Sequence, residues 1–214
     1  MEAKTLDLRR QWKYLYQPSA KQVSVVEVPP FQFAMIDGQI EPGRAPADSP
    51  AFQEAVAALY GVAYTLKFTS KLRPLDPIDY PVMALEGLWW VENGQFSEFD
   101  INRPEGRRWT LMIMQPDNIT PEMFADGLRL LVKKRGEEPA FSRLRLERFA
   151  EGLCLQIMHI GPYSEEPATL ARIHAFAEQN GYQLYGKHHE IYLGDPRRSA
   201  PDKLKTVLRR PITR

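Results

Sequence analysis

Short apolar segments and amphipathic segments alternate along the chain, which indicates strands and helices in turn. Val23 to Val28 is rich in β-branched residues and stops at two prolines, so it predicts a strand. Phe31 to Ile36 predicts a second strand, which the turn-forming pair Asp37-Gly38 ends. Apolar residues then recur at helical spacing from Ser49 to about Lys67, and the Ser49-Pro50 pair is typical of a helix start.

The next segments complete this first unit and lead to a second one. Val82 to Val91 and Trp109 to Met114 predict two strands, which a polar connection at 92–107 joins. Thr120-Pro121 repeats the helix-start signature, and Gly136 is typical of a helix end. We therefore expect a helix that connects the two units.

The second half of the chain repeats the order of the first. Arg143 to Phe149 and Leu153 to Ile160 predict strands, and Ser164 to Pro167 opens a helix. Lys187 to Leu193 and Thr206 to Arg209 predict the last two strands. In each half, therefore, two strands precede the helix and two strands follow it.

Three pairs of short elements carry the repeat. They are Phe33–Gly38 with Gln156–Gly161, Ala84–Leu88 with His188–Tyr192, and Gln115-Pro116 with Arg210-Pro211. Such a duplication predicts an α+β fold, built from two strand-helix-strand-strand modules with pseudo-twofold symmetry. We expect antiparallel sheets, helices on their outer faces and a central ligand cleft at the pseudo-axis.

The length of 214 residues fits one domain whose two halves share a core. Within a single domain at 1–214, the expected parts are a leading arm at 1–20, a first repeat at 21–118, a connecting helix at 119–142 and a second repeat at 143–214.

Each half places one glutamate in a mainly apolar strand. Because side chains alternate along a strand, Glu86 shares a face with Trp90, and Glu190 shares one with His188 and Tyr192. The repeat sets Glu86 opposite Glu190, so we expect both to face one cleft. A carboxylate in an aromatic cleft can neutralise a cation, accept a hydrogen bond or act as a general base. Glu86 also fits a solvated strand face or a structural hydrogen bond.

Composition narrows the function classes. Four Trp, nine Tyr, ten Phe and seven Met fit either a rich core or an aromatic ligand pocket. The net charge of +1 argues against nucleic acid as a partner. The charged N-terminus has no signal-peptide pattern, and no apolar run approaches the roughly 20 residues of a membrane span. A cytoplasmic protein with no membrane association is expected, and the pattern leaves its oligomeric state open.

Metal and thiol chemistry are not indicated. Cys154 is the only cysteine, so neither an intrachain disulfide nor a thiolate cluster can form. His188 and His189 are adjacent in a strand and point to opposite faces, so they cannot bind one metal together. We expect no metal and no cofactor. His159 fits either a pocket wall or a core histidine.

Five segments, in the same order along the chain, resemble stand-alone bacterial members of the GyrI-like small-molecule-binding family. They are Leu85–Trp90, Ile113–Pro116, His159–Tyr163, His188–Leu193 and Asp195–Arg198. The resemblance implies binding of amphipathic or cationic small molecules, with Glu190 at the centre of the pocket. The basic helical pair of the family's DNA-binding regulators does not precede Val23.

A subset of these stand-alone proteins hydrolyses cyclopropanoid DNA-alkylating compounds, and the resemblance implies that detoxifying activity here. Glu190 would then be the base or the group that positions water. Tyr192 and Trp90 would be pocket walls and could donate hydrogen bonds to the ring-opened phenolate. The expected ligand-binding residues are Glu86, Trp89, Trp90, Trp109, Met112, His159, Tyr163 and His188.

Two other functions stay open. The protein could bind multidrug-like or cationic ligands without chemistry, or it could act on a protein partner in the manner of a gyrase inhibitor. A DNA mimic would have an acidic surface, so the net charge of +1 weighs against the gyrase-inhibitor function.

Overall fold

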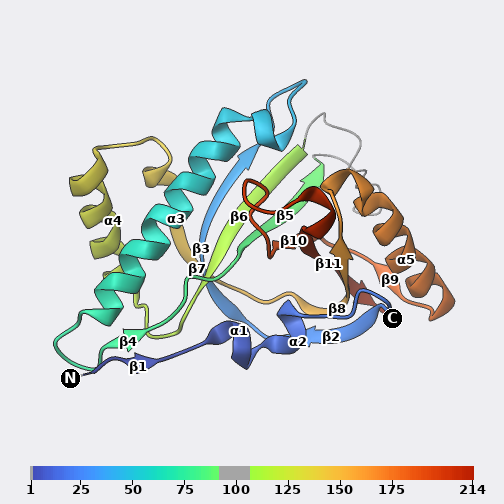
Figure 1. Cartoon of the computed structure of the whole chain (residues 1–214), viewed down its shortest axis with the longest axis horizontal. Helices are drawn as coiled ribbons and strands as arrows, with labels where there is room; N and C mark the ends of the chain where they lie inside the picture. Colours follow the sequence, from blue (N-terminus) through green and yellow to red (C-terminus); the bar gives the residue numbers. More distant parts are fainter. Residues whose placement is uncertain (1, 92–106) are drawn as a thin grey trace.

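One antiparallel sheet forms the body of the computed structural model, which describes residues 2–91 and 107–214 (Figure 1). Apart from Arg107, the predicted connection at 92–107 lies outside these described residues. The strands of the main path are β2 (Ser24–Val28), β3 (Phe31–Gln39), β5 (Leu85–Val91), β6 (Arg107–Gln115), β7 (Arg145–Phe149), β8 (Gly152–Ile160), β10 (His188–Tyr192) and β11 (Lys205–Thr213).

The remaining elements lie around this sheet. β9 (Gln183–Leu184) pairs with the end of β11, and β1 (Lys4–Thr5) pairs with β4 (Ile78–Asp79). The α-helices are α1 (Leu8–Gln11), α2 (Lys13–Tyr16), α3 (Pro50–Lys71), α4 (Pro121–Arg135) and α5 (Glu166–Gln179). The predicted starts of α3 and α4 are confirmed, because the Ser49 and Thr120 hydroxyls cap them by accepting backbone N–H groups.

The strand order β2-β8-β11-β10-β5-β6-β3-β7 is symmetric about its centre. There, β5 of the first half pairs antiparallel with β10 of the second. The halves also exchange strands, since β2 pairs with β8 and β7 pairs with β3. The α+β class and the antiparallel pairing are confirmed. We expected separate sheets in the two halves, but the pairing of β5 with β10 joins them into one sheet.

α3 and α5 cover the same face of this sheet, on either side of β10 (Figure 1). Phe52 of α3 stacks on Trp89, and Ile173 of α5 packs in a cluster with Leu208. Paired residues of neighbouring strands point to the same face, and Leu208 pairs with Glu190. We therefore call this side the Glu190 face. α4 packs on the outside of α3.

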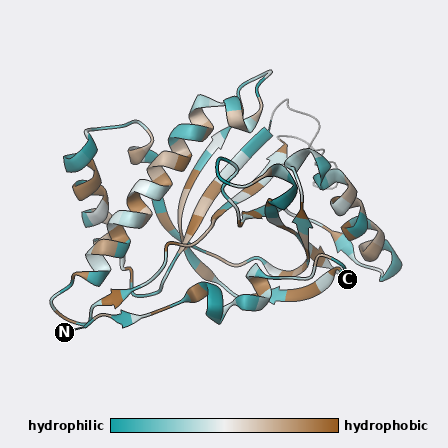
Figure 2. Cartoon of the chain, viewed as in Figure 1, coloured by the Kyte–Doolittle hydropathy of each residue, from teal (hydrophilic) through white to brown (hydrophobic). Residues whose placement is uncertain are grey.

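The opposite face is covered by α1, α2 and the segments beside them. Leu15 and Tyr16 of α2 are buried there. Glu86, Met112, His189 and Arg209 occupy neighbouring positions on this side, which we call the Glu86 face. Hydrophobic residues gather along the strands between the two layers (Figure 2).

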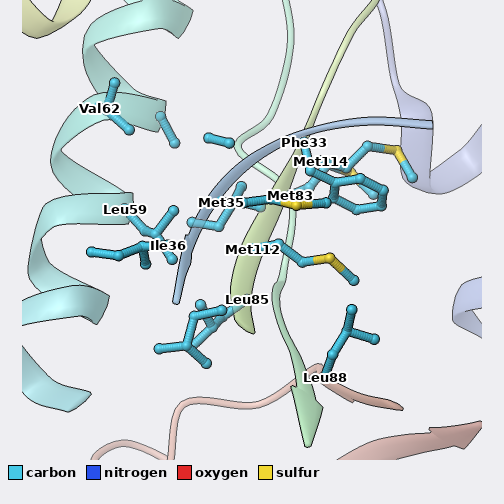
Figure 3. Close-up of a cluster of buried hydrophobic side chains, with 14 of the residues drawn as sticks. Phe33, Met35, Ile36, Leu59, Val62, Met83, Leu85, Leu88, Met112 and Met114 are labelled. Carbon is cyan, nitrogen blue, oxygen red and sulfur yellow. The ribbon is translucent and has the colours of Figure 1, made fainter. Parts of the chain in front are cut away.

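A close-up of the core separates the two faces. The Phe33, Met35, Met112 and Met114 side chains lie on one side of the strands (Figure 3). On the other side, Ile36, Leu59 and Val62 lie between β3 and α3 (Figure 3). No helix of the described residues is long and apolar enough to cross a bilayer.

The register corrects the predicted equivalence of the two glutamates. Met35 pairs with Met112, and their predicted counterparts in the second half, Met158 and Val207, also pair. Glu86 pairs with Met112, however, whereas Val207 pairs with Ile191. The structural counterpart of Glu86 is therefore Ile191, one residue past Glu190.

This shift of one position has a large geometric consequence. Successive strand residues point to opposite faces, so a one-residue shift turns a side chain to the other side of the sheet. Glu86 and Glu190 consequently lie on opposite faces and cannot wall one cleft. The expectation of a shared site for the two carboxylates is wrong.

Candidate functional site

A chain of hydrogen bonds ends on Glu190, which lies on β10 beside Gly87 of β5. The Tyr192 hydroxyl donates to Glu190 Oε2 at 2.7 Å, and the Trp89 indole Nε1 donates to that hydroxyl at 2.9 Å. His188 Nε2 lies 3.0 Å from Glu190 Oε1. Glu190 is only 6% exposed, so these partners offset much of the cost of burying a carboxylate.

Aromatic rings surround this carboxylate. Phe52 stacks on Trp89 with ring centroids 5.7 Å apart, and Tyr163 packs edge-on against Tyr192 at 5.9 Å. Tyr192 and Tyr163 are half-buried. The Glu190 face therefore gathers aromatic rings around one carboxylate, which are groups that recognise planar organic ligands.

Gly87 makes room for this arrangement. A Cβ at this position would lie 2.8 Å from Trp89 Nε1 and 3.1 Å from the Tyr192 hydroxyl. Those atoms form the hydrogen bond that orients Tyr192, so any side chain here would separate them.

Gly87→Ala is expected to weaken ligand binding at least several-fold, because the new methyl group pushes Trp89 and Tyr192 apart. Titration of tryptophan fluorescence with a planar ligand measures the affinity. Gly61→Ala on α3 is the control, since its Cβ meets only the Leu131 and Arg135 side chains. Equal affinity of the Gly87 and Gly61 variants would contradict a site over Gly87.

A second carboxyl belongs to the same region. Glu166 begins α5 and is 0% exposed. Burial, followed by the charge of Glu190, raises the pKa of Glu166 to about 10, and the Thr206 hydroxyl opposes the rise. Glu166 is therefore a neutral carboxylic acid at neutral pH.

Burial also keeps the other titratable neighbours of Glu190 neutral. Burial and then Glu190 raise the pKa of Tyr192 well above its ordinary value. Burial, Glu166 and Glu190 raise the pKa of Tyr163 to about 12. Burial lowers the pKa of His188, although its bond to Glu190 opposes that change. At neutral pH these groups can therefore donate hydrogen bonds without adding charge.

Three of the predicted ligand-binding residues, Glu86, Trp90 and Met112, lie on the Glu86 face instead. Glu86 Oε1 accepts the Tyr16 hydroxyl at 2.7 Å, and Glu86 Oε2 lies 3.0 Å from His189 Nε2. Met112, which pairs with Glu86, is fully buried in the core. The cavity beside Glu86 is about 10 Å³, which is on the scale of one water molecule. Glu86 therefore ties α2 to the sheet.

Glu86 is one end of a buried network of charges. His189 Nδ1 lies 2.9 Å from Glu151 Oε2, which also accepts Arg209 Nη1 at 3.1 Å. Burial alone would raise the pKa of Glu151, but His189 and Arg209 lower it to about 2. Burial would likewise lower the pKa of His189, but Glu151 and Glu86 raise it to about 9. At neutral pH Glu151, His189 and Arg209 are therefore charged and mutually paired.

Trp90 lies on the Glu86 face as well, at the end of β5. Lys187 Nζ sits 3.5 Å from the Trp90 ring centroid, beside an open hollow of about 350 Å³. Asp37, Arg108 and Arg145 also line this hollow. Trp90 is therefore separated by the sheet from Glu190, contrary to the expected common pocket wall.

Trp109 and His159 lie on the Glu190 face but make structural contacts. Trp109 is 0% exposed and lies across Gly38, where a Cβ would be 2.2 Å from its ring. His159 Nδ1 lies 2.9 Å from Thr169 Oγ1, and Nε2 lies 3.1 Å from the Pro162 carbonyl oxygen. These bonds hold the start of α5 near β8, which helps to place Glu166.

Sequence reasoning did not identify Phe52, Thr206 or Glu166 as parts of the site. Phe52 matched the apolar stripe of α3, and Glu166 matched the usual acidic first turn of a helix. No local signal distinguishes these roles, because the contacts come from segments far apart in the sequence. Among the described residues, no group of His, Cys, Asp and Glu side chains could hold a metal ion.

The chain is similar to a known protein family and to solved structures. The family model described as a GyrI-like small molecule binding domain matches residues 127–212. An uncharacterized conserved protein from Listeria innocua is 38% identical with a TM-score of 0.87, covering 97% of this chain and 100% of its own. A hydrolase encoded by lin2189 from Listeria innocua is 36% identical with a TM-score of 0.83, covering 98% of this chain and 100% of its own.

More distant likeness is limited to the fold. The EcmrR C-terminal domain has a TM-score of 0.53 at 9% identity and covers 90% of this chain and 98% of its own. No curated protein matches the chain. Relatives above 30% identity over almost the whole length, together with the matching family model, show that the chain belongs to the GyrI-like small molecule binding domain family.

Proposed function

We propose that this protein binds planar, amphipathic molecules over Glu190 and hydrolyses cyclopropanoid alkylating compounds, which detoxifies them. The observation that carries the proposal is the chain of Trp89, Tyr192 and Glu190 within an aromatic surround. Similarity to a hydrolase over nearly the full chain supports the choice of hydrolysis as the reaction class.

The reaction needs a base and a flat surface. In such compounds a cyclopropane is conjugated to a dienone, so opening the ring restores an aromatic phenol. Water attacks the strained CH₂ carbon, and the C–C bond to the ring carbon breaks. Its electron pair moves through the ring to the carbonyl oxygen. Glu190 takes the proton that water loses, as a general base.

Tyr192 prepares Glu190 for this task. Its hydroxyl donates to Glu190 Oε2 and accepts from Trp89, so both its proton and its ring are oriented before a ligand arrives. A carboxylate oxygen can accept a further hydrogen bond, which leaves acceptor capacity for a water molecule. Pre-orientation of this kind lowers the barrier by removing the need to reorganise the site during the reaction.

Binding without chemistry is the second candidate. Each oxygen of Glu190 already has one protein partner, Tyr192 or His188, as is usual for a buried structural carboxylate. Such a carboxylate with aromatic neighbours would still attract a cationic ligand.

Turnover distinguishes the two functions. The purified protein is mixed with a roughly fifty-fold excess of a synthetic spirocyclopropyl-cyclohexadienone. The ring-opened phenol is then quantified by liquid chromatography and mass spectrometry. Many equivalents of product per protein are expected, because a base is regenerated after each cycle. Protection limited to one equivalent, with saturable quenching of tryptophan fluorescence, would overturn hydrolysis and favour the binding function.

A further inference from the structure

Glu166 is a buried carboxyl that the reaction described above does not use. It is 0% exposed, and neither of its oxygens makes a hydrogen bond of normal geometry among the described residues. A buried polar group without a partner is costly, so such groups are rare unless they have a function. The Thr206 hydroxyl, also buried and without a bond of normal geometry in the described part of the chain, lies close enough to Glu166 to oppose the rise in its pKa.

The fold brings Glu166 toward Glu190 from a different element. Glu166 is the first residue of α5 and directly follows the turn that carries Tyr163, which packs on Tyr192. Thr206 on β11 pairs with Tyr192 on β10, so both neighbours of Glu166 also border the Glu190 site. The charge of Glu190 contributes to the raised pKa of Glu166 and to that of Tyr163.

The two carboxyl groups differ in their surroundings. Glu190 has two hydrogen-bond partners, Tyr192 and His188. Glu166 has burial and the neighbouring Glu190 charge, which both favour its neutral form. A carboxyl group kept neutral by burial next to a hydrogen-bonded carboxylate is a usual arrangement of an acid and a base.

The hydrolysis proposed above has a need that matches this pair. The electron pair of the broken C–C bond ends on the former carbonyl oxygen, which must gain a proton to become a phenol. Glu190 meanwhile gains a proton from water, so the site needs a proton donor in addition to a base.

We propose that Glu166 is the proton donor of the Glu190 site, an inference that rests on the proposed hydrolysis. During ring opening the O–H bond of Glu166 breaks, and its proton passes to the product oxygen, directly or through the Thr206 hydroxyl. Glu190 then returns the proton taken from water to Glu166, so that substrate and water give product with no net change in the protein. The N-terminus of α5 favours the transient negative charge on Glu166.

The test uses Glu166→Gln and Glu166→Asp beside the wild type. Gln keeps the shape and neutrality of the acid but has no acidic proton, whereas Asp keeps the acid on a shorter side chain. We expect kcat of Glu166→Gln to fall by roughly 10²-fold, with partial recovery in Glu166→Asp. Binding of the spirocyclopropyl-cyclohexadienone, measured by tryptophan quenching, should be unchanged in Glu166→Gln.

Two further readouts separate a proton donor from a structural residue. The wild-type kcat should decline as the pH approaches the pKa of Glu166, which is about 10, while the residual kcat of Glu166→Gln should not decline there. Infrared spectra of the wild type should contain a protonated carboxyl band that is absent from Glu166→Gln and retained in Glu190→Gln.

Each outcome decides the inference. If the Glu166→Gln variant folds and its kcat equals that of the wild type, the role of Glu166 is overturned and the proposed hydrolysis is unaffected. Equal losses in both variants together with weakened binding would mean that Glu166 is structural. Absence of turnover in the wild type would instead refute the proposed function and, with it, the donor role, whatever the infrared band shows.

Discussion

Glu190→Gln is expected to reduce turnover by roughly 10²- to 10⁴-fold, the usual contribution of a general base. Gln has the shape of Glu but cannot take the proton that water loses. Its NH₂ group would also replace one of the two acceptor oxygens that Tyr192 and His188 now contact. We therefore expect loss of kcat and some weakening of the Trp89–Tyr192–Glu190 chain.

Glu86→Gln is the matched control for that measurement. Both glutamates lie on the two adjacent central strands, but Glu86 is on the opposite face of the sheet. Glu86→Gln should keep the wild-type kcat while the melting temperature falls, because its oxygens bond Tyr16 and His189. Loss of kcat in Glu86→Gln but not in Glu190→Gln would place the chemistry on the other face.

Arg209→Met is expected to destabilise the protein by about 3–5 kcal/mol, the typical cost of removing one partner of a buried ion pair. Arg209 is only 3% exposed and donates to the Glu151 carboxylate at 3.1 Å. It also donates to the Gln156 side chain and to the Leu15 carbonyl oxygen. Met fills similar space but leaves the buried Glu151 charge with less compensation. Urea unfolding at pH 7 measures the loss.

The pH dependence identifies the cause of that loss. Since the folded pKa of Glu151 is lowered to about 2, its stabilising contribution exists above the ordinary pKa of about 4.5 and disappears as the pH falls toward 2. The difference between Arg209→Met and the wild type should therefore shrink over that range, because neutral Glu151 no longer needs a cation.

An exposed arginine provides the comparison. Arg148 pairs with Asp117, and both side chains are exposed, so Arg148→Met should change the free energy of unfolding by less than about 1 kcal/mol. A loss in Arg209→Met no larger than that of the Arg148 variant would show that the buried network contributes little to stability.

The same network has an upper pH limit. The folded pKa of His189 is raised to about 9, so its contribution exists below the ordinary pKa of about 6.5 and is lost as the pH rises through 9. The network should therefore stabilise the wild type fully only between the pH range in which Glu151 becomes protonated and the range in which His189 loses its proton.

Local patterns predicted the elements that neighbouring residues determine. The Ser49-Pro50 and Thr120-Pro121 pairs marked the starts of α3 and α4, because a capping hydroxyl and a proline act within one turn. Alternation along β10 placed Glu190, His188 and Tyr192 on one face, and the structure connects all three by hydrogen bonds. These parts of the candidate site needed no knowledge of distant contacts.

Tertiary structure alone decided what shares a site with Glu190. The repeat set Glu86 against Glu190, but the pairing of β5 with β10 differs from that alignment by one residue and sends Glu86 to the other face. Register depends on contacts along the whole sheet, which short matching segments do not contain. Glu166 reaches the site for a similar reason. The packing of α5 on the sheet buries it near Glu190, and no pattern near residue 166 indicates this. By itself the sequence determined the order of strands and helices and the carboxylate on β10, whereas long-range packing determined its partners.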